Sequence, residues 1–306
     1  MIPADFTYHR PDTKVQALQL LRQTGDNGRV LAGGHSLLPM MKLRLAAPAH
    51  LIDITRIGEL KGISASGARI EIGAMTTQHE LIGSDALAAR CPIIRETALL
   101  IADPQVRYCG TIGGNVGNGD PGNDMPALMQ CLDASFVLES ASGVREVAAR
   151  AYYQGPYITA LKPGEMLTKI RFAAPPAGHG YAYKKLKRKV GDYATAAAAV
   201  ILEMSGGKVR KASIALTNVG PTPLYAKDAV DRITGTSLDA ADIDAAVAAA
   251  EAIAAPADDG RGSVEYRRKM AGVMVRRALA EAADRAGDIK AADVKSGGGV
   301  FGWLRN

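Results

Sequence analysis

The two stretches best suited to chemistry are turns rich in glycine. The first, Ala32–Leu37 (Ala-Gly-Gly-His-Ser-Leu), lies between a short apolar run and a helical pattern that begins at Leu37. Adjacent glycines permit a positive φ and let another group approach the backbone closely. Backbone N–H groups at a helix start attract phosphate oxygens. This turn is therefore predicted to bind an anionic group, with the Ser36 hydroxyl as a further donor.

A second glycine-rich segment, Thr111–Asp124, follows further along the chain. Its fourteen residues hold five glycines, three asparagines, two aspartates and one threonine. Asp124 is predicted to cap the helix that follows, and a capping carboxylate can also accept hydrogen bonds from sugar-like hydroxyls. Asp120-Pro121-Gly122 is most simply a turn. The density of donors and acceptors predicts a polar binding loop.

Several other kinds of site are disfavoured. The first turn does not match the dinucleotide fingerprint GxGxxG, and the phosphate loop GxxxxGKS/T is missing from the chain. No GxSxG elbow surrounds Ser36, so we expect no nucleophile there. Cys91, Cys109 and Cys131 show no CxxC spacing, and three cysteines cannot hold a four-thiolate iron–sulfur cluster. With no clustered histidines, we expect no metal site in this chain.

Length and charge narrow the class of protein. A chain of 306 residues can bury a sizeable core and is predicted to form two domains. No apolar run reaches about 18 residues, so no membrane span is expected. The first residues lack a secretory pattern, which favours a cytoplasmic location. The net charge of +6 is concentrated in 184–189 and 267–269 without stacking aromatics, so an anionic cofactor or partner subunit is favoured over nucleic acid.

Strand and helix patterns alternate through the first part of the chain. Strands are expected at 6–8, 30–32, 50–54, 63–65, 69–73, 136–138, 167–172, 181–186, 193–205 and 209–219. Helices are expected at 13–25, 37–43, 76–81, 85–101 with a break at Pro92, 124–132, 223–233, 240–253 and 264–286. The Ala-rich stretch 196–202 is also compatible with a helix. The Pro- and Gly-containing stretch 173–178 predicts a domain boundary near residue 177.

The motifs together resemble a known family. Ala32–Leu37 with Leu43-Arg44, Leu51–Ile54, Thr111–Asn115 and Asn123–Leu128 is similar to the flavin-binding medium subunits of molybdenum hydroxylases. That family includes aerobic carbon monoxide dehydrogenase and the FAD part of xanthine dehydrogenase. The resemblance continues through Lys162–Glu165 and Glu265–Gly272 and so covers nearly the whole chain.

The resemblance implies an α+β fold. Residues 1–176 would form an FAD-binding domain of the vanillyl-alcohol-oxidase (para-cresol methylhydroxylase, PCMH) type, built of two α+β subdomains. Residues 177–290 would form a C-terminal domain of the carbon monoxide dehydrogenase flavoprotein type, with a small three-stranded antiparallel sheet and helices. Residues 291–306 are expected to be a flexible tail, in which Phe301, Trp303 and Leu304 are a candidate anchor.

The resemblance also implies the cofactor site. The two turns would hold the diphosphate of FAD, Asp124 its sugar-like chain, and Ile101 and Leu167 would lie against the cofactor. Tyr193 would neighbour the isoalloxazine, and Lys184 or Lys187 would stabilise the reduced, anionic flavin; an exposed strand edge is the alternative for this basic segment. The implied cofactor-binding residues are Leu31, Ala32, Gly33, Gly34, His35, Ser36, Leu37, Ile101, Thr111, Gly113, Gly114, Asn115, Asn118, Asp124, Leu167, Lys184 and Tyr193.

The implied function is electron transfer within a heterotrimer, and two heterotrimers are expected to pair as a dimer. No residue of this chain would act as a catalytic acid, base or nucleophile. Substrate would be oxidised at a molybdopterin centre on a large subunit. Electrons would pass through two 2Fe–2S clusters on a small subunit to this FAD and then to an external acceptor. Two alternatives stay open: a stand-alone FAD oxidase with its own substrate pocket, and an assembly protein without flavin. The substrate also stays open among carbon monoxide, aldehydes, purines and other N-heterocycles, as does membrane association through the complex.

Overall fold

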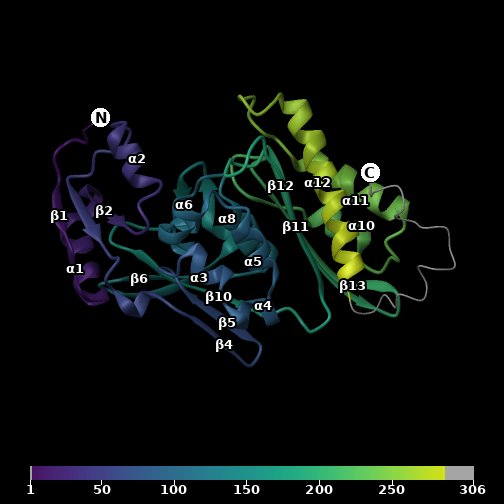
Figure 1. The fold of residues 1–306 in the computed structure, drawn as a ribbon, viewed down its shortest axis with the longest axis horizontal. Coiled ribbons are helices and arrows are strands. Elements are labelled where there is room, and N and C mark those ends of the chain that lie inside the picture. Colours follow the sequence, from purple (N-terminus) through teal and green to yellow (C-terminus); the bar gives the residue numbers. More distant parts are fainter. Residues whose placement is uncertain (1, 287–306) are drawn as a thin grey trace.

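The computed structural model describes residues 2–286. The expectations for the tail at 291–306, and for the last residues of the C-terminal domain, lie outside this range. Among the described residues, no helix is both long and apolar enough to cross a membrane. The described chain contains three main sheets, arranged from one end of the molecule to the other (Figure 1).

The first sheet is small and parallel, and it places the first glycine turn. Its strands β1 (Thr7–His9), β3 (His50–Asp53) and β2 (Gly28–Leu31) lie in that order, with α1 (Lys14–Thr24), a 3₁₀ turn (Gly25–Asn27) and α2 (Leu37–Lys42) connecting them. Thr13 caps α1 in a capping box with Gln16. The turn at Gly33–Ser36 follows the carboxyl end of β2, as the sequence predicts.

The second sheet has five strands, β4 (Ile63–Ser66), β5 (Arg69–Gly73), β10 (Met166–Ala173), β6 (Ser135–Ser140) and β7 (Gly143–Ala148), in that spatial order. A 3₁₀ turn (Gly58–Leu60) precedes it. Apolar and charged residues alternate along β5 and β10, so Ile70, Ile72 and Ile170 are buried on one face.

Helices cover the apolar face of this sheet. They are α3 (Gln78–Ile82), α4 (Asp85–Arg90), α5 (Ile93–Leu99), α6 (Pro104–Cys109), α7 (Ile112–Gly117) and α8 (Asp124–Cys131). The segment after β7 forms α9 (Ala149–Tyr152) and a small pair of strands, β8 (Tyr153–Gly155) and β9 (Ile158–Thr159). Sequence patterning identified neither α6 nor α7, since both are short and α7 is rich in glycine.

The third sheet carries the last helices. Its strands are β11 (Gly180–Leu186), β12 (Ala196–Ser205), β13 (Lys208–Thr217) and β14 (Leu224–Tyr225), so the expected three-stranded sheet has a fourth, two-residue strand. The helices are α10 (Lys227–Ile233), α11 (Ala240–Ile253) and α12 (Val264–Arg285). Figure 1 shows α12 crossing this sheet. The predicted helix start at Pro223 is wrong, because β14 precedes α10.

The Ala-rich stretch 196–202 is a strand and not a helix. It pairs with β11 on one side and β13 on the other. Alanine side chains are small, so both faces of β12 admit close neighbours: Ala197 and Ala199 join the core with α8, while Ala196 and Ala198 join the core with α12. The hydroxyl of Ser213 also donates to the Cys131 carbonyl at 2.6 Å. The third sheet is thus packed directly against α8, which follows the second glycine-rich segment.

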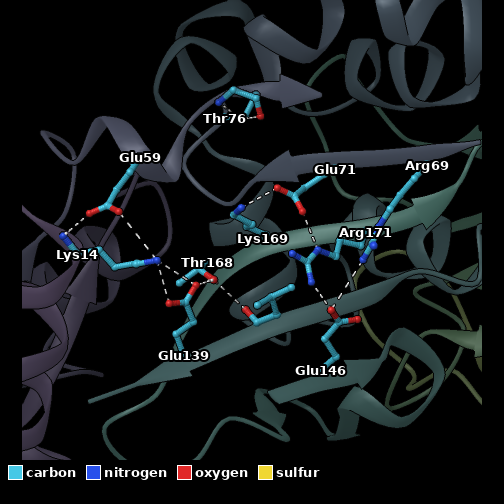
Figure 2. A network of polar contacts seen from close by, with 12 residues as sticks. Lys14, Glu59, Arg69, Glu71, Thr76, Glu139, Glu146, Thr168, Lys169 and Arg171 are labelled. Atoms are coloured by element: carbon cyan, nitrogen blue, oxygen red, sulfur yellow. Dashed lines mark hydrogen bonds and ion pairs between the residues drawn. The ribbon is translucent and has the colours of Figure 1, made fainter. Parts of the chain in front are cut away.

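The outer face of the five-stranded sheet carries a network of charges (Figure 2). Glu71 accepts hydrogen bonds from Lys169 Nζ at 2.6 Å and Arg171 Nε at 2.7 Å. The bond from Lys169, with a further contribution from Arg171, lowers the pKa of the Glu71 carboxyl. Lys14 of α1 forms an ion pair with Glu139 of β6 at 2.9 Å. The network therefore ties the first sheet to the second.

The lowered pKa of Glu71 gives a pH-dependent prediction. A carboxyl whose pKa is lower in the folded state than its usual 4.5 stabilises the fold above that pH, and this contribution is lost as pH falls through the folded pKa. Glu71→Gln is expected to lower the free energy of unfolding by about 1 kcal/mol at pH 7. Denaturant unfolding should show this gap closing below about pH 4.5. A gap that did not narrow as the pH falls below 4.5, or one equalled by the exposed control Asp258→Asn, would contradict the assignment.

Candidate cofactor-binding site

A cavity of about 830 Å³ opens between the first two sheets and the start of the third. Its wall contains both glycine turns, part of β10, and the segment 191–193 before β12. The volume is at the upper end of the range for small-molecule and cofactor sites. The predicted site residues that line it are Ala32, Gly33, Gly34, His35, Ser36, Leu37, Ile101, Thr111, Gly113, Gly114, Asn115, Asn118, Asp124, Leu167 and Tyr193.

The first turn packs against the backbone of the segment that precedes the second. A Cβ at Gly33 would lie 2.3 Å from the Cys109 carbonyl oxygen, so only glycine fits there. Gly34 has a φ of 75°, a left-handed conformation that favours glycine. Within residues 2–286, the backbone N–H groups of His35 and Ser36 donate to no protein acceptor. These donors are available to an acceptor in the cavity.

The first part of the second glycine-rich segment is helical, since residues 112–117 form α7, and this corrects the prediction of a loop there. Thr111 caps α7, and its side chain accepts a hydrogen bond from the N–H of Gly114 at 3.0 Å. A Cβ at Gly113 would lie 2.6 Å from Ala74 Cβ, so glycine lets α7 approach the end of β5. Asn115 is also fixed, since its carbonyl accepts from Asn123 Nδ2 at 2.8 Å. The glycines thus serve the packing of a short helix against the sheet.

Asp124 is not the helix cap that the sequence suggested. Asn123 occupies the capping position, and Asp124 is the first residue of α8. Its carboxylate is 4% exposed and accepts from Tyr183 Oη at 2.6 Å and Lys185 Nζ at 2.8 Å. Burial raises the pKa of Asp124, while the ammonium of Lys185 acts in the opposite direction. Because Tyr183 and Lys185 are on β11, the pair joins α8 to the third sheet at the cavity wall.

Three predicted residues lie outside the cavity wall: Leu31, Lys184 and Lys187. Side chains alternate between faces along a strand. Arg29, Val30 and Ala32 line the cavity and Leu31 does not, so alternation does not account for Leu31. Lys185 lines the cavity, whereas Lys184 forms an ion pair with Glu281 of α12.

The far wall is partly aromatic and partly apolar. Tyr193 is 42% exposed and lies close to Gly122, where a Cβ would be 2.7 Å from the ring. The guanidinium of Arg261 lies 5.6 Å from the ring centroid of Tyr193. Burial is the main cause that raises the pKa of the Tyr193 hydroxyl, and the neighbouring Asp120 adds to it. Ile101 and Leu167 supply apolar surface.

The sequence did not identify several lining residues. Lys185 was missed because the choice between adjacent lysines depends on strand register. Gln78 was predicted only as part of the helix at 76–81, yet it lines the cavity and is 1% exposed. Neither polar atom of its side chain has a partner within the described part of the chain. Hydrophobic periodicity indicates neither the strand register that selects Lys185 nor the unpaired amide of Gln78.

These features fit an acidic, hydroxyl-rich cofactor. The free N–H groups of His35 and Ser36 suit the oxygens of a diphosphate, and the unpaired amide of Gln78 suits a further polar group. In residues 2–286, no three His, Cys, Asp or Glu side chains cluster in a way that could hold a metal ion.

Comparison with known proteins agrees with this fit. The family model for the FAD-binding domain in molybdopterin dehydrogenase matches residues 4–175, and that for the CO dehydrogenase flavoprotein C-terminal domain matches residues 181–282. The chain is 65% identical to the carbon monoxide dehydrogenase medium chain of Afipia carboxidovorans, over 94% of this chain and 99% of that one.

Solved structures give the same result. The reconstituted CO dehydrogenase from Oligotropha carboxidovorans contains a chain with a TM-score of 0.92 and 65% identity, covering 94% of this chain and 100% of that one. Quinoline 2-oxidoreductase from Pseudomonas putida 86 contains one with a TM-score of 0.89 and 33% identity, with the same coverage. The chain therefore belongs to the family of FAD-binding medium subunits of the molybdenum hydroxylases.

Proposed function

We propose that this FAD-binding, electron-transferring subunit belongs to a carbon monoxide dehydrogenase. The observation that carries the proposal is the 65% identity to a carbon monoxide dehydrogenase medium chain along nearly the full length of both proteins, about twice the identity to the quinoline enzyme. This identity narrows the substrates that the sequence motifs left open. Carbon monoxide would be oxidised on a partner subunit, and no residue of this chain would act as acid, base or nucleophile.

We place FAD in the cavity with its diphosphate between the turns at Gly33–Ser36 and Thr111–Asn115. The free N–H groups of the first turn support this placement. Ile101 and Leu167 would contact the cofactor through apolar surface, and Tyr193 would lie beside the isoalloxazine. Residues 1–176 would be the PCMH-type FAD-binding domain and 177–290 the C-terminal domain, so the cofactor would contact both.

Lys185 takes the electrostatic role that the resemblance implied for Lys184 or Lys187. Its ammonium is buried on the cavity wall and paired with Asp124. Bound FAD supplies the electron-transfer chemistry of the subunit. A buried positive charge nearby favours the negative charge that FAD gains on reduction. Lys185 and Asp124 would thereby set the reduction potential without touching substrate.

The subunit composition of the complex is proposed from the same similarity to a carbon monoxide dehydrogenase medium chain. Partner subunits would carry the molybdopterin cofactor and two 2Fe–2S clusters, and two heterotrimers would form the complete cytoplasmic complex. A mass measurement of the native complex and fractionation of cells would test these two points.

The first prediction from the proposed function concerns the substrate. The chain purified with its co-encoded partner subunits should show a flavin absorption band that carbon monoxide bleaches, while the chain alone keeps its band under the same gas. Visible spectroscopy before and after exposure measures both. Bleaching of the isolated chain by a small organic compound would instead identify a stand-alone oxidase. Bleaching of the complex by an aldehyde or purine, but not by carbon monoxide, would overturn the proposed substrate.

The second prediction concerns the first turn. Gly33→Ala places a Cβ against the Cys109 carbonyl, so the two turns must separate. The dissociation constant for FAD, measured by quenching of flavin fluorescence, should rise at least about tenfold. Gly58→Ala is the matched control, because a Cβ there meets no atom within 4 Å. Equal FAD affinity in both variants would contradict the placement of the diphosphate.

The third prediction separates the two adjacent lysines. Lys185→Met removes a buried positive charge at the cavity and should lower the FAD midpoint potential by roughly 30 mV or more, since about 30 mV corresponds to 1.4 kcal/mol for a two-electron couple. Lys184→Met removes the same charge on the opposite face of β11 and should leave the potential nearly unchanged. Spectroscopic redox titration of both variants decides the matter. A larger shift in the Lys184 variant would refute the assignment.

A further inference from the structure

Gln78 is an unusual residue on the cavity wall. It is the first residue of α3, and its backbone N–H donates to the Gly110 carbonyl at 2.9 Å. The backbone is therefore fixed next to Thr111 and the start of α7. The side chain is 1% exposed, and within residues 2–286 neither Oε1 nor Nε2 has a hydrogen-bond partner.

Such an arrangement is unfavourable for the protein alone. Buried polar groups are almost always paired, and leaving one unpaired costs about 1–3 kcal/mol. Other buried side chains in the described range also carry an unpaired atom, but Gln78 is the one among them that lines the cavity. No protein hydrogen bond holds its amide, so a rotation of the side chain toward the cavity breaks none.

The two unpaired atoms indicate the kind of group that would satisfy them. An amide offers donors at nitrogen and an acceptor at oxygen. A phosphoryl oxygen only accepts and would leave Oε1 unpaired. A pair of adjacent hydroxyls both donates and accepts, so it can satisfy both atoms of the amide. FAD carries adjacent hydroxyls on either side of its diphosphate, in the ribityl chain and in the ribose.

We propose that the Gln78 carboxamide binds adjacent hydroxyls of the sugar-like part of FAD, next to the diphosphate. The inference rests on the proposed placement of FAD in the cavity. The Gln78 amide would then have opposite effects on the stability of the cofactor-free chain and on the affinity for FAD. The amide destabilises the cofactor-free chain and strengthens cofactor binding.

The test compares two buried glutamines in the full-length chain. Gln78→Met keeps the size of the side chain and removes both polar atoms. Gln130→Met is the matched control, because Gln130 is 4% exposed, lies outside the cavity wall, and donates from Nε2 to the Pro223 carbonyl at 3.2 Å. Each variant is freed of FAD and divided into two samples. One is unfolded by heat to give the melting temperature, and the other is titrated with FAD by flavin fluorescence.

The expected results have opposite signs. Gln78→Met should raise the FAD dissociation constant about tenfold and raise the melting temperature of the cofactor-free chain by about 2 °C. Gln130→Met should lower that melting temperature and leave the dissociation constant within about twofold of the wild type. Competition by ADP then identifies the hydroxyls. Weakened ADP binding in Gln78→Met points to the ribose, and unchanged ADP binding points to the ribityl chain.

Two results would overturn the inference. One is an FAD dissociation constant of Gln78→Met equal to that of the wild type. The other is a cofactor-free Gln78→Met chain that melts as low as Gln130→Met, since its amide would then already have a partner in the protein. Gly33→Ala distinguishes a wrong assignment of Gln78 from a wrong placement of FAD in the cavity. If Gly33→Ala weakens FAD binding and Gln78→Met does not, only the assignment of Gln78 is wrong.

Discussion

The contact of Gly33 with the carbonyl of Cys109 is the constraint on which the rest of the cavity depends. It joins a turn of the first sheet to the segment just before α7, with no side chain between the two backbones. The second turn is held in the same way, since Gly113 lies against Ala74 at the end of β5. The starts of α2 and α7, which are distant in sequence, are thereby held close together. A wider spacing would move the free N–H groups of His35 and Ser36 away from the second turn.

A second constraint is the buried charge of Asp124. A carboxylate that is nearly inaccessible to solvent must be paired, because its desolvation is costly. Its partners, Tyr183 and Lys185, come from β11. Strand alternation places both on the face that meets α8, while Lys184 forms its ion pair with α12 on the other face. The polar floor of the cavity is therefore made jointly by the helix after the second turn and by the third sheet.

The sequence was informative where local chemistry determines structure. The cap at Thr13, the turn after β2 and the alternating strands follow from side-chain hydrogen bonding and periodicity, and the shared motifs indicated the family. It was uninformative where tertiary contacts decide. Glycine in α7 has low helix propensity, but a cap and the packing against Ala74 outweigh it. The choice of Lys185 over Lys184 depends on a register of one residue, and the unpaired amide of Gln78 becomes visible only when its surroundings are known.

The position of the cavity has a consequence for how long the subunit survives in the cell. Elements of three sheets border it, so a ligand there is linked thermodynamically to the folding of all of them. Binding to the folded state alone adds about 1.4 kcal/mol of stability for each tenfold excess of free ligand over its dissociation constant. Supply of the cofactor would then regulate abundance, because chains made during flavin shortage unfold more often and are exposed to proteases.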